Sequence, residues 1–598
     1  MQSLATATHL IQAGQFARAR GLLERLVRAC PAPSQAYWLL ASVRLKLGDS
    51  PGAEQSIRIF ITLEGETASS LALLGEILEA QGRAADAEVA FRQALIRDPG
   101  SSLIVTRIAT ILLAQDRVHE ALELIESFIN VAEETPTLVL LRAQSLLAMG
   151  DHQRAITAFR KAAALLPDNG FAWIGLAAAL ADDGQHVAAE TAVKHAATHG
   201  HDNAQTRFVL ARALLAQRRY DEAEVEFRNA IRLRPGYMQA HINLAETLWM
   251  RTGDAKLVSD EIDAFLHSNP SLSPLRLLKA RLLEASGDTT AALTELDSAI
   301  ARDNSDSALH VAASQIALKC DADKALRHAR LAMQFGPANL PMLGTYGNAL
   351  LASGHAAEAG DLADKQLAVN PFDGLALALR ATAWRMLGDQ RYHDIYDYGR
   401  LVRPEIIDTP NGWPSLSAYL GDLSRGLLGL HPFRTHPIGQ SLRHGTQADL
   451  VLRHANHPAI LAFAQAINGP IRRYMQAIGH GSDPLRQRNT GNYKLSGVWS
   501  VRLRPNGYHF NHFHPQGWLS SACYIHLPPA VSSSGGEGWL QFGQPAFPTR
   551  PATPPEYFVR PEPGLLVLFP SWFWHGTVPF SGAPDDYRLT IAFDVVPG

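Results

Sequence analysis

Apolar residues in the first two-thirds of the chain recur with a period of about 34 residues. Within each period, two stretches place apolar and small residues at helical spacing. We therefore predict two antiparallel helices per period, with small residues allowing close approach and a phenylalanine filling the gap between periods. Three periods show the pattern most clearly: Gly75, Ala87, Phe91 and Ala94; Ala143, Ala155, Phe159 and Ala162; Ala211, Ala223, Phe227 and Ala230.

Glycine and proline mark the ends of the predicted helices with the same period. Glycine follows the first helix of a period and proline follows the second, as expected of residues that end helices. Asp116, Arg218 and Asp321 stand where the glycine is missing. The prolines are Pro31, Pro99, Pro167, Pro235, Pro270, Pro337, Pro371 and Pro404, and the glycines are Gly14, Gly48, Gly82, Gly150, Gly184, Gly253, Gly287, Gly354 and Gly388.

The pattern changes after Pro404. Residues 405–440 contain several prolines and scattered aromatic residues, and residues 457–475 have helical spacing. Short apolar or alternating runs bounded by Gly and Pro follow, with no helix between them, at 497–503, 519–527, 538–542, 564–569 and 588–596. Such runs favour an antiparallel sandwich or barrel. We predict a helical array at 1–404, a helical and irregular lead-in at 405–490, and a jelly-roll domain at 491–598 with a site at its mouth.

Composition narrows the class of protein. A chain of 598 residues is too long for one hydrophobic core. Its net charge of −3 provides no basic surface for nucleic acid or for a membrane. No apolar run approaches the ~20 residues that span a bilayer. Cys30, Cys320 and Cys523 are far apart and form no disulfide framework. Since the N-terminus also lacks the basic start of a signal peptide, we expect a soluble cytoplasmic protein without nucleic-acid or membrane partners.

The candidate chemistry lies in the predicted strands. His512 and His514 bracket one residue, so on a strand both imidazoles point to the same face. His575 follows a predicted strand that would bring it back across the domain. A close pair followed by a distant histidine is the order in which a double-stranded β-helix builds an iron site with open positions for cosubstrate and oxygen. We therefore expect a non-haem iron centre here.

Two resemblances extend this interpretation. The periodic region resembles the tetratricopeptide repeat (TPR), in about twelve copies, which implies a superhelix whose concave groove binds a protein or peptide. Residues from about 495 to 594 resemble a bacterial 2-oxoglutarate/Fe(II) oxygenase domain often found behind such repeats. The matching segments are 500–503, 512–524, 564–575 and 588–593, and segment 440–447 resembles the same group.

The resemblance implies roles for individual residues. His512 and His575 would be iron ligands, and Arg588 would pair with the distal carboxylate of 2-oxoglutarate, for which a planar guanidinium is suited. Thr590, two residues on, would donate a hydrogen bond to that carboxylate. Tyr524 or Ser521 would line the cosubstrate pocket.

The third ligand is left open, because the wider superfamily has Asp or Glu where this chain has His514. His514 could coordinate iron in a three-histidine site. It could instead stand behind a two-histidine site completed by water, or a distant carboxylate such as Glu537 could complete the site. A lone buried histidine is usually a hydrogen-bonded core residue, and His509 or His526 could be such a residue.

These features predict an α+β multidomain protein, a TPR superhelix followed by a double-stranded β-helix that uses Fe(II) and 2-oxoglutarate. The leading hypothesis is a dioxygenase that hydroxylates a protein or peptide held in the repeat groove. One alternative is an oxygenase acting on a small molecule, with repeats that recruit partners. The other is a repeat scaffold with a degenerate, non-catalytic oxygenase-like domain.

Overall fold

A computed structural model of the chain describes residues 2–29, 31–130, 132–336, 339–532 and 535–598. It divides into two compact units, Met1–Leu233 and Arg234–Gly598. Cys30 and Pro337, which the sequence pattern singled out, lie outside the described residues. The boundary between the two units, after Leu233, falls inside the repeat array. The predicted domain boundaries at 404 and 490 therefore stay predictions.

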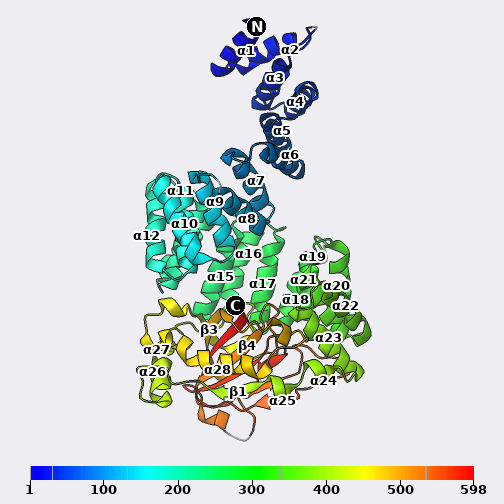
Figure 1. Cartoon of the computed structure of the whole chain (residues 1–598). Coiled ribbons are helices and arrows are strands. Elements are labelled where there is room, and N and C mark those ends of the chain that lie inside the picture. The colour runs from blue at the N-terminus through cyan, green and yellow to red at the C-terminus, as the bar shows by residue number, and fades with distance from the viewer. Residues whose placement is uncertain (1, 30, 131, 337–338, 533–534) are drawn as a thin grey trace. The chain divides into compact units, whose positions relative to one another are not determined.

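The first unit consists of helices that pair with their neighbours in sequence (Figure 1). Their bounds are α1 Gln2–Gln12, α2 Phe16–Leu26, α3 Ser34–Lys46, α4 Ser50–Glu64, α5 Ala68–Ala80, α6 Ala84–Arg97, α7 Ser102–Ala114, α8 Val118–Ile129, α9 Pro136–Ala148, α10 His152–Leu165, α11 Gly170–Asp182, α12 His186–Thr198, α13 Ala204–Ala216 and α14 Tyr220–Leu233.

The turns and contacts between helices agree with the sequence pattern. Periodic glycines such as Gly82 and Gly150 have positive φ, the conformation that favours glycine after a helix. Asp116 and Arg218, which replace glycine, also have positive φ. A Cβ at Gly75 would lie 2.7 Å from the Phe91 ring, so glycine there permits the close approach of the two helices.

Asp321 differs from the other two replacements. Its φ is −146°, and its side chain accepts a hydrogen bond from the Lys324 backbone N–H as the N-cap of the following helix. Aspartate is a favoured residue at that position, so the turn is made by capping and not by a left-handed residue.

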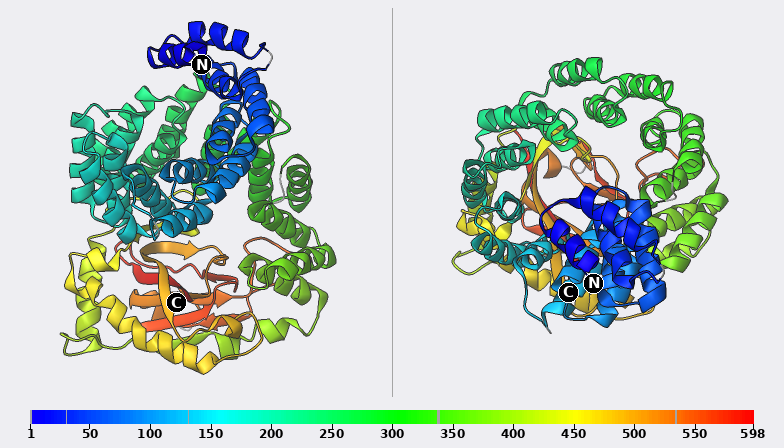
Figure 2. Two further views of the ribbon diagram at one scale, coloured as in Figure 1. Left: turned by 45° about the horizontal axis from the view of Figure 1, so that its top comes forward. Right: turned by 90° about the horizontal axis from the view of Figure 1, so that it is seen from above.

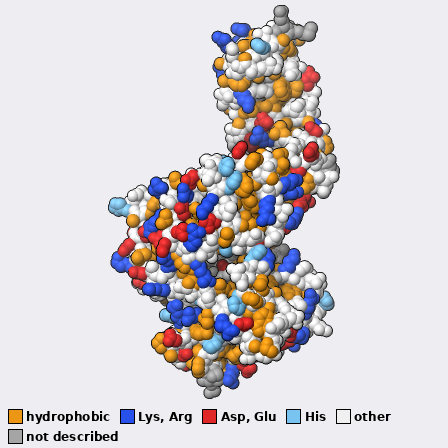
Figure 3. Space-filling view, turned by 90° about the vertical axis from the view of Figure 1, so that its left-hand side faces the viewer, with side chains coloured by type: hydrophobic (Ala, Val, Ile, Leu, Met, Phe, Trp, Pro, Cys, Tyr) orange, Lys and Arg blue, Asp and Glu red, His pale blue; other side chains and the backbone are white. Residues whose placement is uncertain are grey.

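Acidic and basic side chains are mixed over the surface of the first unit (Figure 3). Some form ion pairs between successive repeats, such as Arg83 with Glu54 at 3.0 Å and Arg219 with Glu190 at 2.8 Å. Because the arginines are exposed to solvent, which screens their charge, such pairs contribute little to stability. They balance charge locally, in keeping with the small net charge of the whole chain.

The second unit begins with further repeat helices and ends with a sheet domain. The repeat helices and the two short helices after them are α15 Met238–Thr252, α16 Ala255–Ser268, α17 Ser273–Ala285, α18 Thr289–Ile300, α19 Ser307–Ala317, α20 Ala322–Phe335, α21 Leu340–Ala352, α22 Ala356–Val369, α23 Gly374–Leu387, α24 Tyr392–Ile395 and α25 Tyr398–Leu401. The helices of the lead-in are α26 Leu416–Leu428, α27 Pro458–Leu461 and α28 Phe463–Ile478.

The sheet domain contains antiparallel strands in two sheets. One sheet has the order β1-β7-β4-β9-β3-β2 and the other β6-β5-β8. The strands are β1 Arg403–Ile406, β2 Leu442–Asp449, β3 Tyr493–His509, β4 Leu519–His526, β5 Leu540–Phe542, β6 Tyr557–Val559, β7 Leu565–Pro570, β8 His575–Thr577 and β9 Arg588–Pro597. The predicted antiparallel β class is confirmed, and the jelly-roll connectivity stays a prediction.

The last repeats of the second unit share a core with the sheet (Figure 2). A single cluster of buried apolar residues extends from Ala317 through α21 and α23 to Val595 at the end of β9. Polar contacts join the same parts: Trp574 Nε1 donates to Thr382 Oγ1 at 3.0 Å, and Tyr396 donates to the Trp572 carbonyl at 2.7 Å. In the described part of the chain, no helix has the length and apolarity needed to cross a bilayer.

Candidate metal and cosubstrate site

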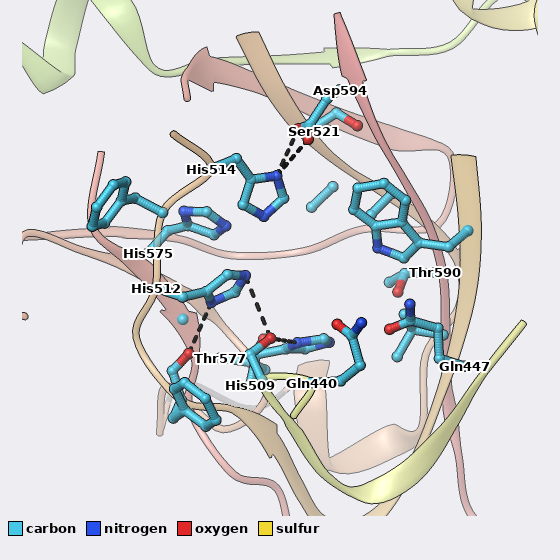
Figure 4. Close-up of a pocket in the computed structure, with 18 of the residues that line it drawn as sticks. Gln440, Gln447, His509, His512, His514, Ser521, His575, Thr577, Thr590 and Asp594 are labelled. Carbon is cyan, nitrogen blue, oxygen red and sulfur yellow. Dashed lines mark hydrogen bonds and ion pairs between the residues drawn. The ribbon is translucent and has the colours of Figure 1, made fainter. Parts of the chain in front are cut away.

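Two antiparallel segments bring the three predicted histidines together. His512 and His575 form a backbone pair, with N–O distances of 2.8 and 2.9 Å, and the His514 backbone N–H donates to the Ser571 carbonyl at 2.8 Å. One ring nitrogen from each of His512, His514 and His575 lies within 4.8 Å of the others. Figure 4 shows the three imidazoles facing one another across one end of a cavity.

Each imidazole is oriented by a hydrogen bond at Nδ1. His512 Nδ1 contacts the Phe510 carbonyl and His575 Nδ1 contacts the Phe573 carbonyl, both at 2.9 Å. Because a carbonyl oxygen only accepts, Nδ1 carries the proton in both rings. The lone pair is therefore on Nε2 in each case, as a metal ligand requires.

His514 has a stronger anchor, the carboxylate of Asp594. His514 Nδ1 lies 2.7 Å from both Asp594 oxygens, and Ser520 Oγ donates to Oδ1 of the same carboxylate at 2.7 Å. A carboxylate behind a histidine fixes the tautomer and makes the imidazole a better metal ligand. This arrangement favours coordination by His514.

Burial keeps the rings of His512 and His575 neutral. It lowers the pKa of His512 to about 3, helped by the neighbouring His514 ring. Burial, together with the charges of His512 and His514, also lowers the pKa of His575 well below its usual range. Metal binding requires unprotonated imidazoles, so His512 and His575 need lose no proton near neutral pH.

The donor set fits a divalent first-row metal such as iron. Three imidazoles on one side of a cavity of about 550 Å³ leave the opposite side open. Glu537 does not take part, because its carboxylate accepts hydrogen bonds from the Ser581 backbone N–H and hydroxyl, at 2.8 and 2.7 Å. The anion nearest the ligands is Asp594, one hydrogen bond behind His514.

Arg588 fits the distal carboxylate of 2-oxoglutarate. Its side chain lines the cavity and is only 2 % exposed, and its Nε has no hydrogen-bond partner among the described residues. Burial lowers its pKa, against a smaller raising effect of Tyr524. A buried cation without an anionic partner is costly, and a bound carboxylate would remove that cost.

Three further residues were predicted at the cosubstrate site, and they differ in whether they line the cavity. Thr590 lines the cavity beside Arg588, on the same face of β9. Tyr524 lies under Arg588, with its ring centroid 4.9 Å from the guanidinium carbon, and is not among the lining residues. Ser521 lines the cavity, but its hydroxyl already donates to the Phe593 carbonyl at 2.7 Å and accepts from the Phe593 N–H at 2.9 Å.

Of the two histidines interpreted as core residues, one is part of the site. His509 lines the cavity and its Nδ1 lies 2.9 Å from Ser441 Oγ. His526 is outside it, stacked on Tyr587 with ring centroids 4.3 Å apart.

Sequence reasoning gave no role to several residues that line the cavity. Asp594 was missed because it is eighty residues from His514, and only strand pairing brings them together. Gln440 and Gln447 lie opposite the histidines (Figure 4). They belong to segment 440–447, whose resemblance was visible, but a glutamine alone carries no signal of its partner.

Comparison with known proteins finds a family match for the C-terminal sheet domain and for the repeat region. Residues 497–594 match the family described as "Putative 2OG-Fe(II) oxygenase". Tetratricopeptide repeat families match residues 61–199 and residues 4–63 and 208–268. The chain therefore contains tetratricopeptide repeats and a C-terminal domain that matches this family. No curated protein matches its sequence significantly.

Solved structures similar to parts of the chain include proteins described as TPR proteins. The C-terminal part of a TPR protein from Cytophaga hutchinsonii is 17% identical, covers 40% of this chain and 97% of that one, and has a TM-score of 0.33. Yeast Tom70 is 15% identical, with coverages of 65% and 89% and a TM-score of 0.33. YrrB, described as a TPR protein with an unusual peptide-binding site, is 16% identical, with coverages of 31% and 96% and a TM-score of 0.28. Scores this low carry no conclusion about function.

Proposed function

We propose that this chain is a 2-oxoglutarate- and Fe(II)-dependent dioxygenase that hydroxylates a protein or peptide recruited by its repeats. The observation that carries the proposal is a single cavity with two complementary ends. Three imidazoles with anchored Nδ1 atoms converge at one end, and the buried guanidinium of Arg588, whose Nε has no hydrogen-bond partner among the described residues, lines the same space.

Different residues would bind the metal and the cosubstrate. His512, His514 and His575 would hold iron through Nε2, while Arg588 and Thr590 would hold the distal carboxylate of 2-oxoglutarate. When both are bound, they supply the oxidation: one atom of O2 enters a substrate C–H bond as hydroxyl, and the other enters 2-oxoglutarate, which leaves as succinate and CO2. Asp594 keeps the His514 proton on Nδ1, so that Nε2 stays available.

A protein or peptide substrate is supported by the repeats and by how they meet the domain. Tetratricopeptide repeats generally mediate protein interactions. Here the last repeat contacts the residues that surround the ligands, since Thr382 of α23 bonds Trp574, next to His575. A partner bound along these repeats would lie close to the domain that carries the metal site.

An anaerobic titration tests the proposal. Fe(II) and 2-oxoglutarate are added to the wild-type protein and to His514→Ala, and the visible metal-to-ligand charge-transfer band is followed. We expect a band in the wild type and its loss or strong weakening in the variant. A wild-type protein without the band would favour the scaffold alternative. A full band in His514→Ala would leave the dioxygenase proposal intact and remove His514 from the ligands.

A further inference from the structure

A second cavity of about 510 Å³ adjoins the metal cavity. The two share His509, Phe510 and Thr577 as lining residues. Thr577 is two residues beyond His575 on β8, so the shared wall is continuous with a predicted iron ligand. Whatever fills the second cavity would therefore lie next to the group that reacts at the metal.

The lining of the second cavity has no charged side chain among the described residues. It consists of prolines, aromatic residues, threonines, alanines, side-chain amides and the imidazole of His509. The amides form a short chain, in which Gln541 Nε2 donates to Asn511 Oδ1 at 2.8 Å and Asn511 Nδ2 lies 3.5 Å from the Pro545 carbonyl. Such amides can pair with a peptide backbone, whereas a charged ligand group would be buried without a counter-charge, at a high cost.

The far wall of this cavity is attached to the repeats. Residues 544–554 supply much of the lining, and Arg385 of α23 donates to the Gly543 carbonyl at 2.8 Å and the Pro554 carbonyl at 2.6 Å. Arg385 also pairs with Glu556 at 2.9 Å. The cavity therefore lies between the metal site and a loop held by the last repeat.

The shared wall is held from the repeat side as well. Two cations lie near the Phe510 ring, Arg443 at 5.2 Å and Lys319 at 5.4 Å from its centroid. Both cations pair with Glu284 of α17, so their charge is partly balanced on the far side of the ring. Phe510 lines both cavities, whereas neither Arg443 nor Lys319 is among the residues that line them.

From this geometry we propose that the second cavity binds the uncharged part of a peptide substrate, on the side adjoining the residue that is hydroxylated. This inference rests on the proposed dioxygenase function and specifies its substrate class. The residues next to the target would be neutral, and their backbone would pair with the amides of Gln541 and Asn511. Charged residues would be excluded from those positions.

A degenerate library of unstructured peptides tests this specificity. The full-length protein, loaded with Fe(II) and 2-oxoglutarate, is incubated with the library in air, and peptides that gain one oxygen atom are sequenced by mass spectrometry. We expect Asp, Glu, Lys and Arg to be depleted by about tenfold or more at one or more positions beside the modified residue. In Gln541→Glu, a new carboxylate lines the cavity, so Lys or Arg should become enriched at one of those positions.

Matched measurements separate the possible failures. Gln93→Glu makes the same change at an exposed site on α6 and should give the wild-type product set. Absence of the anaerobic charge-transfer band in the wild type would overturn the dioxygenase proposal and this inference with it. A normal band with no modified peptide, with charged residues equally frequent beside the target, or with an unchanged product set in Gln541→Glu would overturn the peptide inference alone.

Discussion

Replacing Asp594 by Asn should weaken metal binding although Asp594 is not itself a proposed ligand. In the native site the carboxylate accepts from His514 Nδ1 with both oxygens at 2.7 Å, and Ser520 holds one of them. Asparagine has the same shape but no charge and only one accepting oxygen. Loss of such a partner typically costs 10–100-fold in metal affinity, about 1.4–2.8 kcal/mol.

The orientation of the new amide decides where in this range the loss falls. If its oxygen faces His514, the ring keeps its tautomer and only the charge is lost, so the cost should be near tenfold. If its NH2 group faces the ring, Nδ1 must accept, the proton moves to Nε2, and the ligand atom is blocked. The second case should approach a hundredfold loss.

The assay is an anaerobic titration with Co(II) or Fe(II), with thermal unfolding as a check on the fold. Asp586→Asn is the matched control, because Asp586 lies in the same domain and bonds the Ala583 backbone N–H. In a His514→Ala background, Asp594→Asn should have no further effect, since the carboxylate acts through that ring. Wild-type metal affinity in Asp594→Asn, or equal losses in both backgrounds, would refute the reasoning.

Three further changes have expected outcomes. Arg588→Ala should weaken 2-oxoglutarate binding by about 2–5 kcal/mol in calorimetry while Co(II) affinity changes little, because a buried charge pair is lost. Thr382→Val should lower the free energy of unfolding by about 1–3 kcal/mol in urea, because the Trp574 indole N–H loses its partner. Burial raises the pKa of Glu246 to about 7, so the folded protein binds a proton that the unfolded chain releases near pH 4.5. Stability should therefore fall as pH rises from about 4.5 through 7, and Glu246→Gln should remove this fall, worth about 3 kcal/mol at pH 8.

Each of these predictions has its own control. Unchanged 2-oxoglutarate affinity in Arg588→Ala would exclude the guanidinium from the cosubstrate site. Thr382→Ser retains the hydroxyl, and stability equal to that of the valine variant would show that the bond to Trp574 contributes nothing. Glu123→Gln alters an exposed glutamate on α8 and should leave the pH profile as in the wild type. Parallel profiles of Glu246→Gln and the wild type would contradict the pKa argument.

The repeat array was predictable because each repeat shows the same local sequence pattern. Small residues, a phenylalanine and a turn residue recur at fixed spacing, so one unclear repeat is corrected by its neighbours. The strands at 519–527, 564–569 and 588–596 were found for a similar local reason, since each is an apolar run bounded by turn residues. β1, β2, β6 and β8 were missed because they are short or polar and exist through pairing with partners far along the chain.

The site was predictable as far as its chemistry is carried by rare residues at short spacing. The three histidines and Arg588 were selected on this ground, and the structure places them around one cavity. Asp594 could not be selected, because an aspartate on a strand has no distinguishing local pattern. Strand register decides where Asp594 lies: β4 and β9 pair so that Ser520 faces Asp594.

The end of the sequence period at Pro404 does not mark an end of packing. The sequence period and the hydrophobic core have different causes. The period reflects how each helix contacts its neighbours in the array, whereas the burial of a helix depends on every surface that the helix contacts. α23 fits the repeat pattern, yet Thr382 and Arg385 on it contact residues beside His575 and along the second cavity. A repeat helix that bonds residues around the site is constrained on two sides, by the next repeat and by the sheet domain. We expect a partner that shifted α23 to shift Trp574 and the loop at 543–556 as well. We therefore propose that the repeats of the second unit belong to the catalytic part of the protein. We expect a partner that binds along them to alter the metal site.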